Sequence, residues 1–245
     1  MMSLKLWYDI RRRFYASLAF FALIAALHVA VFPFLRVVLG DWTEGVPVLD
    51  SPEVRRLAES YPYYTGSRWY GEIERSALFG ILLALGGVMA EGRTRAALIT
   101  LSLPVSRAAW IAGQLAASLA AVFALNLAGN AIVAAGGTIL GQPIPVSQAV
   151  LGAVLISIAV LPYLAVTLLA SAYTGERLMA AVAAVAFLIF TNKLDYLWAV
   201  DPWLPESLMS VLTHPGFPWK PVVSITSVTA AALAGAIREF QRADF

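Results

Sequence analysis

The stretch Ala90–Gln114, AEGRTRAALITLSLPVSRAAWIAGQ, is a charged insert between two long apolar runs. Residues 76–90, before its charges begin, contain no charged side chain, and none occurs from Ala108 to Thr174 after them. A helix needs about 20 predominantly apolar residues to cross a bilayer. The pattern therefore predicts membrane-spanning helices on both sides of a short polar connector.

The composition points to the same class. The chain has 245 residues, of which 60% are hydrophobic and only 13% charged, whereas a soluble domain carries about 25% charged residues. We expect an all-α integral membrane protein whose first apolar run stays as an anchor instead of being cleaved as a signal peptide. The absence of cysteine excludes disulfides and thiolate metal sites. A net charge of +2 does not indicate a nucleic-acid partner.

We expect a single transmembrane domain over residues 1–245 with six spans. Glycines and prolines between Ala135 and Ser147 predict the turn between the third and fourth spans, and Pro162 is expected to kink the fourth. Residues 3–13 have charged side chains on one side and aromatic and apolar ones on the other, which predicts an interfacial helix or a charged flank that only sets orientation. The spans are expected at about 14–35, 76–90, 108–134, 148–172, 178–192 and 221–237.

The distribution of charge predicts the orientation. The two termini, the insert and the connector Tyr173–Arg177 together hold ten basic and five acidic residues. The loops 36–75 and 193–220 hold seven basic and ten acidic residues. Cytoplasmic segments are enriched in lysine and arginine, so both termini and the insert are expected in the cytoplasm and both long loops outside it.

Several residues are open to two interpretations. The aromatic stretch YPYYTGSRWYG at 61–71 fits a belt at the membrane surface or a ligand-binding lip. His28, inside the first span, fits a neutral hydrogen-bonding residue or a proton or metal site. Asn126 and Asn130 lie one helical turn apart and fit hydrogen bonds between helices or a lined path.

Motifs for catalysis are missing from the sequence. It contains no GxxxxGK[ST] phosphate loop, no HExxH and no GxSxG. The spans hold no acidic or basic residue apart from His28, so an ion-coupled carrier is disfavoured. We expect no enzyme, no metal site and no cofactor in this chain, and an energy source on a partner protein.

The insert resembles the corresponding part of the permease subunits of bacterial type-2 ABC exporters. Glu91-Gly92 follows a span, and Leu101-Ser102-Leu103-Pro104-Val105-Ser106-Arg107 opens a span rich in small residues. The ending Phe240–Phe245, FQRADF, is similar to the family's aromatic and basic ending. The resemblance implies six spans in the bacterial inner membrane, a second permease chain as dimer partner, and contact with membrane lipid.

The resemblance also implies a site for a separate ABC ATPase subunit, which would bind the ATP and Mg²⁺. The connector between the second and third spans would be a coupling helix docked in that subunit, with ionic contacts from its charges and apolar contacts from its leucines. An ordinary positive loop is the alternative interpretation. The docking candidates are Glu91, Gly92, Arg93, Arg95, Leu98, Leu101, Leu103, Pro104, Ser106 and Arg107.

The short second and fifth spans are implied to line the transport pathway, although snorkelling charges at their ends explain their length equally well. The expected cargo is hydrophobic or amphipathic. A membrane scaffold or sensor that binds a cytoplasmic partner without transport is the alternative function, and an ion-coupled carrier is a weaker one. Candidates for pathway lining or helix packing are Gly80, Gly86, Gly87, Asn126, Asn130 and Asn192.

Overall fold

The computed structural model describes residues 2–42, 52–70, 73–85, 106–194 and 218–242. Every regular element in these ranges is a helix, and no strand occurs among them. The elements are α1 (Met2–Trp42), α2 (Pro52–Glu59), α3 (Tyr61–Thr65), the π-helix η1 (Gly66–Tyr70), α4 (Glu74–Ala84), α7 (Arg107–Ile139), α8 (Val146–Ala159), α9 (Leu161–Thr174), α10 (Arg177–Leu194) and α11 (Trp219–Arg242).

Five helical segments in the described ranges are long and apolar enough to cross a membrane. They agree with five of the six predicted spans, so the prediction of a helical, multi-pass membrane protein is confirmed at that level. The predicted second span begins in α4, and its residues 86–90 lie outside the described part of the chain. The five segments are Ile10–Leu35, Arg107–Ile139, Val146–Thr174, Arg177–Leu194 and Trp219–Arg242.

The first helix is longer than the sequence indicated. Helix α1 runs for 41 residues, so residues 3–13 continue directly into the first span instead of forming a separate element. It also extends to Trp42, beyond the expected end at Leu35. Arg36 ends the apolar run but does not end the helix, because helix propensity allows arginine as readily as leucine.

The expected loop 36–75 is therefore largely helical in its described part. It contains the end of α1, then α2, α3 and η1, before α4 begins at Glu74. Pro52 opens α2, and the hydroxyl of Ser60 caps α3 by accepting from the backbone N–H of Tyr63.

The turn between α7 and α8 is shorter than the predicted break at 135–147. Helix α7 continues through Gly136 and Gly137 to Ile139, and the chain reverses within 140–145. A Cβ at Gly136 would lie 2.5 Å from both methyl groups of Val29, so this glycine serves close packing with α1. Gly141, with φ of +73°, is the residue that makes the turn.

The predicted kink in the fourth span occurs as a break between two helices. Helix α8 ends at Ala159 and α9 begins at Leu161, with Pro162 in its first turn. The structure thus confirms the expected effect of Pro162. Proline is tolerated at this position because the first turn of a helix has no intrahelical acceptors for its N–H groups.

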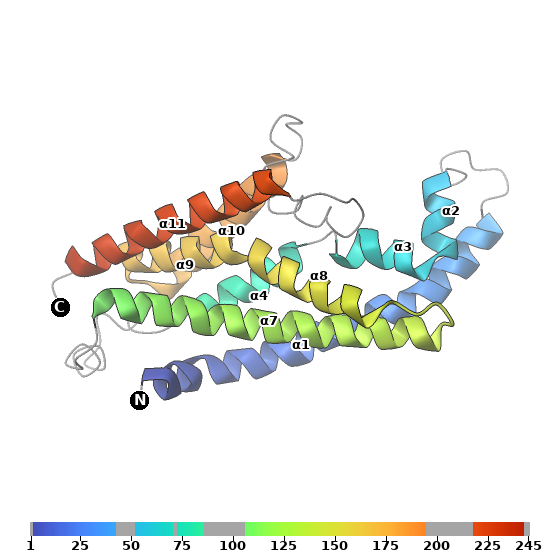
Figure 1. Ribbon diagram of the computed structural model, residues 1–245, viewed down its shortest axis with the longest axis horizontal. Coiled ribbons are helices and arrows are strands. Elements are labelled where there is room, and N and C mark those ends of the chain that lie inside the picture. The colour runs from blue at the N-terminus through green and yellow to red at the C-terminus, as the bar shows by residue number, and fades with distance from the viewer. Residues whose placement is uncertain (1, 43–51, 71–72, 86–105, 195–217, 243–245) are drawn as a thin grey trace.

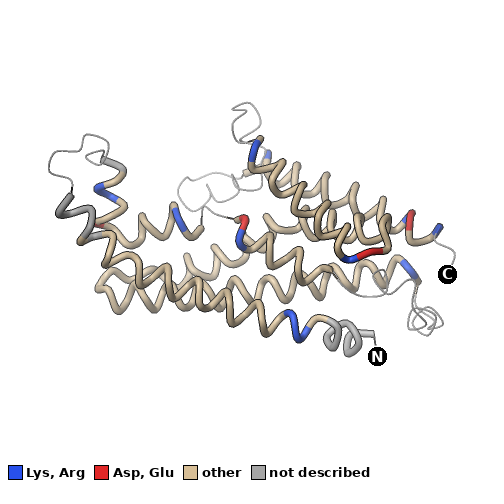
Figure 2. The backbone as a smooth tube through the Cα atoms, turned by 180° about the vertical axis from the view of Figure 1, so that it is seen from behind, with Lys and Arg blue, Asp and Glu red and all other residues tan. Residues whose placement is uncertain are grey.

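Helix α7 lies at the centre of the arrangement (Figure 1). It packs along α1 on one side, against α8 and α4, and near α11, while α9 packs against α10 and α11. Both chain ends, the first residue of α7 and the turn from α9 to α10 lie at the same end of the molecule. In the five membrane-length segments that the structure describes, charged residues lie near the ends and the middle parts carry none (Figure 2).

Candidate functional site

Ser106 and Arg107, the last two docking candidates, are anchored at the shared end of the bundle. The Ser106 hydroxyl caps α7 by accepting a 3.1 Å hydrogen bond from the backbone N–H of Ala109. Arg107 then reaches across to the last turn of α11. Its Nη1 donates to the carbonyl oxygens of Phe240 at 2.6 Å and Gln241 at 3.1 Å.

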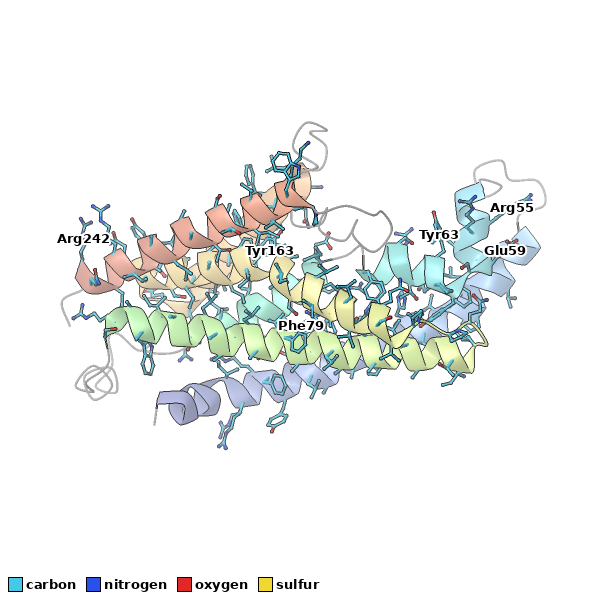
Figure 3. All side chains as sticks on the ribbon, in the orientation of Figure 1. Arg55, Glu59, Tyr63, Phe79, Tyr163 and Arg242 are labelled. Carbon is cyan, nitrogen blue, oxygen red and sulfur yellow. The ribbon has the colours of Figure 1, made fainter. Side chains whose placement is uncertain are left out.

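The same guanidinium lies 5.7 Å from the ring centre of Phe240. Phe240 is buried with Trp110, Ile111, Leu168 and Ala236 in a compact apolar cluster. Arg107 therefore combines hydrogen bonds to helix-terminal carbonyls with a cation–π contact. Arg242, at the end of the same helix, points outward (Figure 3) and lies 3.5 Å from Glu239, its neighbour on α11.

The residues that precede the insert are held in a similar way from α1. Arg13 Nη1 donates to the carbonyl oxygen of Leu82 at 2.9 Å and also to that of Leu85. Leu85 is the C-cap residue of α4. Two arginines from distant parts of the chain, Arg13 and Arg107, thus bind the last carbonyls of α4 and of α11.

A buried polar network joins α4, α7 and α8. Ser76 donates a 2.7 Å hydrogen bond to Oδ1 of Asn126, whose Nδ2 donates to the Ser157 hydroxyl at 3.1 Å. Ser157 in turn donates to the carbonyl of Ala153 at 2.6 Å. All three polar side chains are buried. Such bonds satisfy polar groups that would otherwise face hydrocarbon.

Asn130 forms a second junction one turn further along α7. Its Oδ1 accepts from Trp69 Nε1 at 2.6 Å, and its Nδ2 donates to the carbonyl of Ala149 at 2.8 Å. The side chain is 1% exposed, and both of its hydrogen-bonding groups have partners. Asn126 and Asn130 therefore hydrogen-bond neighbouring elements, which agrees with the interpretation that they join helices.

The aromatic stretch 61–71 packs into the helices in its described part. Tyr61, Tyr64, Trp69 and Tyr70 are buried, and of these aromatics only Tyr63 is exposed, pointing outward from α3 (Figure 3). Four of the five rings therefore pack inside the protein, and the position of the stretch at the membrane surface stays a prediction. Glycines on the opposing helices leave room for these rings.

Three of these glycines show the fit directly. A Cβ at Gly152 would lie 2.5 Å from the Tyr70 ring, and one at Gly137 would lie 3.1 Å from the Tyr61 ring. At Gly129 the Trp69 ring would be 2.9 Å away. Rings inserted at glycines allow the segment to approach α7 and α8 closely.

His28 belongs to this aromatic cluster. Its imidazole stacks on Tyr64 with 4.4 Å between ring centres and lies 5.2 Å from Trp69. Its Nε2 is buried without a hydrogen-bond partner in the described structure. In the described ranges no group of three or more histidine and acidic residues is arranged to hold a metal ion.

Burial changes the acidity of two tyrosines outside the candidate spans. It raises the pKa of Tyr61 and of Tyr70 to about 12, because removal from water disfavours the phenolate. The Tyr61 hydroxyl donates a 2.9 Å hydrogen bond to the carbonyl of Val133, whereas the Tyr70 hydroxyl is buried without a partner.

A groove of about 360 Å³ lies between the second half of α7 and the start of α8. Its lining is mainly apolar, and Asn130 and Thr138 are the polar side chains among the lining residues. Both are engaged locally, since Thr138 donates to the carbonyl of Ala134. The groove is therefore an apolar surface feature. The polar side-chain groups of Asn130 and Thr138 that line it all have hydrogen-bond partners.

The remaining predicted residues fall into two groups. Gly80 packs beneath α9, where an added Cβ would lie 2.8 Å from Val160, and Asn192 near the end of α10 has a buried, unpartnered Oδ1. Their proposed place along a pathway stays a prediction. The candidates that lie outside the described residues are Gly86, Gly87, Glu91, Gly92, Arg93, Arg95, Leu98, Leu101, Leu103 and Pro104.

Sequence reasoning did not single out Arg13, whose contacts depend on the approach of α1 to α4. It also did not assign the ring-accepting role of Gly129, Gly137 and Gly152. In the sequence each of them is only a glycine within an otherwise helical run. Such a glycine indicates close packing but does not show which residue packs against it. No protein-family model matches this chain, and no curated protein matches it.

Proposed function

We propose that this chain is the transmembrane subunit of an ATP-driven exporter. A separate ATPase subunit would dock on residues 91–107 and supply the energy, and a second permease chain would pair with this one in the membrane. The cargo would be hydrophobic or amphipathic, because the described middle parts of the spans carry no charged residue (Figure 2). Both termini and the docking segment would face the bacterial cytoplasm.

One structural observation carries this proposal. Ser106 and Arg107, the last residues of the motif LSLPVSR, lie at the end of the bundle that also holds both termini (Figure 1). A partner bound beside them can reach α7 and α11 together, because Arg107 bonds both Phe240 and Gln241. This placement suits a segment through which an external motor acts on several helices.

The test identifies the ATPase subunits encoded by neighbouring genes and co-expresses the full chain with each of them. We expect the two proteins to purify together, and we expect the isolated permease to hydrolyse no ATP. Charge reversal of both Arg93 and Arg95, or deletion of residues 96–103, should abolish the complex. The matched control is Arg242→Glu, which reverses an exposed arginine outside the docking segment.

Transport is tested in lipid vesicles that contain the purified complex and a fluorescent phospholipid. ATP-dependent movement of the phospholipid would support an exporter. A stable complex without ATP-dependent movement of this probe or of other hydrophobic probes would instead indicate a membrane scaffold. A complex that survives deletion of residues 96–103 would contradict the docking assignment.

A further inference from the structure

We infer that Gln114 and Ser118 form a buried water-binding site on the side of α7 that packs toward α9, within a segment apolar enough to span a membrane. The two residues lie one helical turn apart, so their side chains share one face of α7. The site requires neither a partner protein nor a cargo, and its test is therefore independent of the proposed function.

The polar atoms of both side chains are enclosed by protein. Gln114 is 2% exposed and Ser118 is fully buried. The amide Nε2 and Oε1 of Gln114 and the hydroxyl Oγ of Ser118 have no hydrogen-bond partner in the described part of the chain. Asn126 and Asn130, further along the same helix, differ in this respect, because the amide oxygen and nitrogen of each are bonded to neighbouring elements.

The two unpartnered side chains lie at a boundary between apolar clusters. Toward the start of α7, Ile111 belongs to the compact cluster around Phe240, which also contains Leu168 of α9. Further along α7, Val122 belongs to the main apolar core, which contains Leu164 of α9. The glutamine lies one turn after Ile111 and the serine one turn before Val122, on the face of α7 that packs toward α9.

Helix α9 carries two more hydroxyl groups at this boundary. Thr167 and Ser171 lie within one turn of Leu168, and both are buried. Each donates its proton to a carbonyl of its own helix, Thr167 to that of Tyr163 at 2.6 Å and Ser171 to that of Thr167 at 2.7 Å. A hydroxyl oxygen has two acceptor lone pairs, so both oxygens remain able to accept a hydrogen bond.

Water matches the chemistry of these groups. The amide of Gln114 supplies donors and an acceptor, and the hydroxyl of Ser118 can act as either, which suits a ligand that both donates and accepts. Residues 108–174 contain no charged side chain, so an ion bound here would lack a counter-charge. Both side chains are almost completely buried, so a larger molecule could reach them only if the helices separated.

Bound water also removes an energetic cost. A buried polar group without a partner destabilises a protein, and native proteins satisfy the great majority of such groups with protein atoms or ordered water. A buried water commonly makes about three hydrogen bonds to groups that have no other partner. Water at Gln114 and Ser118 therefore allows a polar layer to persist between two apolar clusters.

The first experiment detects the water by X-ray radiolysis of the full chain in lipid nanodiscs, followed by mass spectrometry. Hydroxyl radicals formed from a bound water oxidise the side chains beside it, even where bulk water does not reach. Ile111 and Leu168, 0% and 1% exposed, are the reporters, and Leu188 on α10, 4% exposed, is the buried control. We expect both reporters to be oxidised at least fivefold faster than Leu188. Equal rates for the three residues would overturn the inference.

The second experiment asks whether these two side chains hold the water. Ser118→Ala and Gln114→Met remove the polar groups and change the side-chain volume little. We expect each substitution to slow oxidation of the two reporters at least threefold. Ser147→Ala and Gln241→Met, at exposed positions, are the matched controls and should leave the rates unchanged. Oxidation at the wild-type rate in both site variants would overturn the inference.

Thermal unfolding gives an independent readout. We expect each single substitution to lower the melting temperature, and the double substitution to lower it by less than the sum, because either one already releases the shared water. A higher melting temperature for Gln114→Met would show that the amide had no partner, and additive effects would show that no water is shared. Either result would overturn the inference. Ser118→Ala removes only one oxygen atom, and it decides the radiolysis experiment if Gln114→Met does not fold.

Discussion

Nε1 of Trp69 donates a 2.6 Å hydrogen bond to Oδ1 of Asn130, and this bond joins η1 to the centre of α7. The same asparagine donates to the carbonyl of Ala149 on α8. One side chain therefore connects the segment between α1 and α4 to two membrane helices. Because the site is buried, its bonds have no water to replace them.

Replacement of Asn130 by leucine should destabilise the protein by about 1–2 kcal/mol, because it leaves the Trp69 N–H unsatisfied and removes the side-chain hydrogen bond to the Ala149 carbonyl. Unfolding of the purified chain in detergent micelles measures the loss. Combination with Trp69→Phe gives a double-mutant cycle, in which we expect a coupling energy of about 1 kcal/mol. Additive effects of the two substitutions would show that this hydrogen bond contributes nothing to stability.

Replacement of Gly136 by valine should destabilise the protein by about 1–3 kcal/mol, since overpacking forces helices apart. The cause is Val29, whose methyl groups lie 2.5 Å from the position of an added Cβ. Val29→Ala should restore part of the loss in the same unfolding assay. Gly66→Ala is the control, because nothing lies within 4 Å of a Cβ there. A Gly136→Val protein as stable as the control would contradict the close approach of α1 and α7.

Ionisation of Tyr61 and Tyr70 should require unusually alkaline solution, because their pKa values are about 12. The folded protein keeps these protons between pH 10 and 12, whereas the unfolded chain, with ordinary tyrosine pKa values near 10, loses them. The unfolded state then binds fewer protons, so stability falls as pH rises through this range. Absorbance at about 295 nm, where the phenolate of tyrosine absorbs, follows the ionisation.

In this titration Tyr70→Phe and Tyr61→Phe should each remove one late-ionising group. Tyr63→Phe is the control, because Tyr63 is exposed. Loss of an early-ionising group from Tyr70→Phe would mean that the Tyr70 hydroxyl is in contact with water.

Replacement of Ser106 by alanine should destabilise the protein by about 1 kcal/mol, because the backbone N–H of Ala109 loses its capping acceptor. Ser106→Asp should keep most of the stability, since aspartate is an equally good cap. Ser147→Ala, at an exposed position of α8, controls for loss of a serine hydroxyl. Equal stability of Ser106→Ala and wild type would show that the cap is dispensable for α7.

The spans were predictable because hydropathy is a local property of the sequence. Uncharged apolar runs, including the short run at 178–192, identified five segments that the structure also shows as long apolar helices. Charges marked helix ends less well. Arg36 suggested an end at Leu35, yet α1 continues to Trp42, because a charged residue ends hydrophobicity without ending helical hydrogen bonding.

The candidate site was predictable only in part. Asn126 and Asn130 stood out because polar residues within a long apolar run need partners, and Arg107 stood out as a docking candidate implied by the resemblance. The structure supplies hydrogen-bond partners for all three. Which groups those partners are could not be predicted. The carbonyls of Phe240 and Gln241 exist in any sequence, and only the approach of α11 to α7 makes them the acceptors for Arg107.

The sequence by itself determined that this is a helical membrane protein with a charged insert among its apolar helices. The composition and periodicity of each segment set the free energy of transferring that segment from water into the bilayer. Tertiary structure alone decided which glycines turn the chain and which accept a ring. Gly141 makes a turn, whereas Gly152 accepts Tyr70. The same residue type serves both roles, and the difference depends on neighbours that lie far away along the chain.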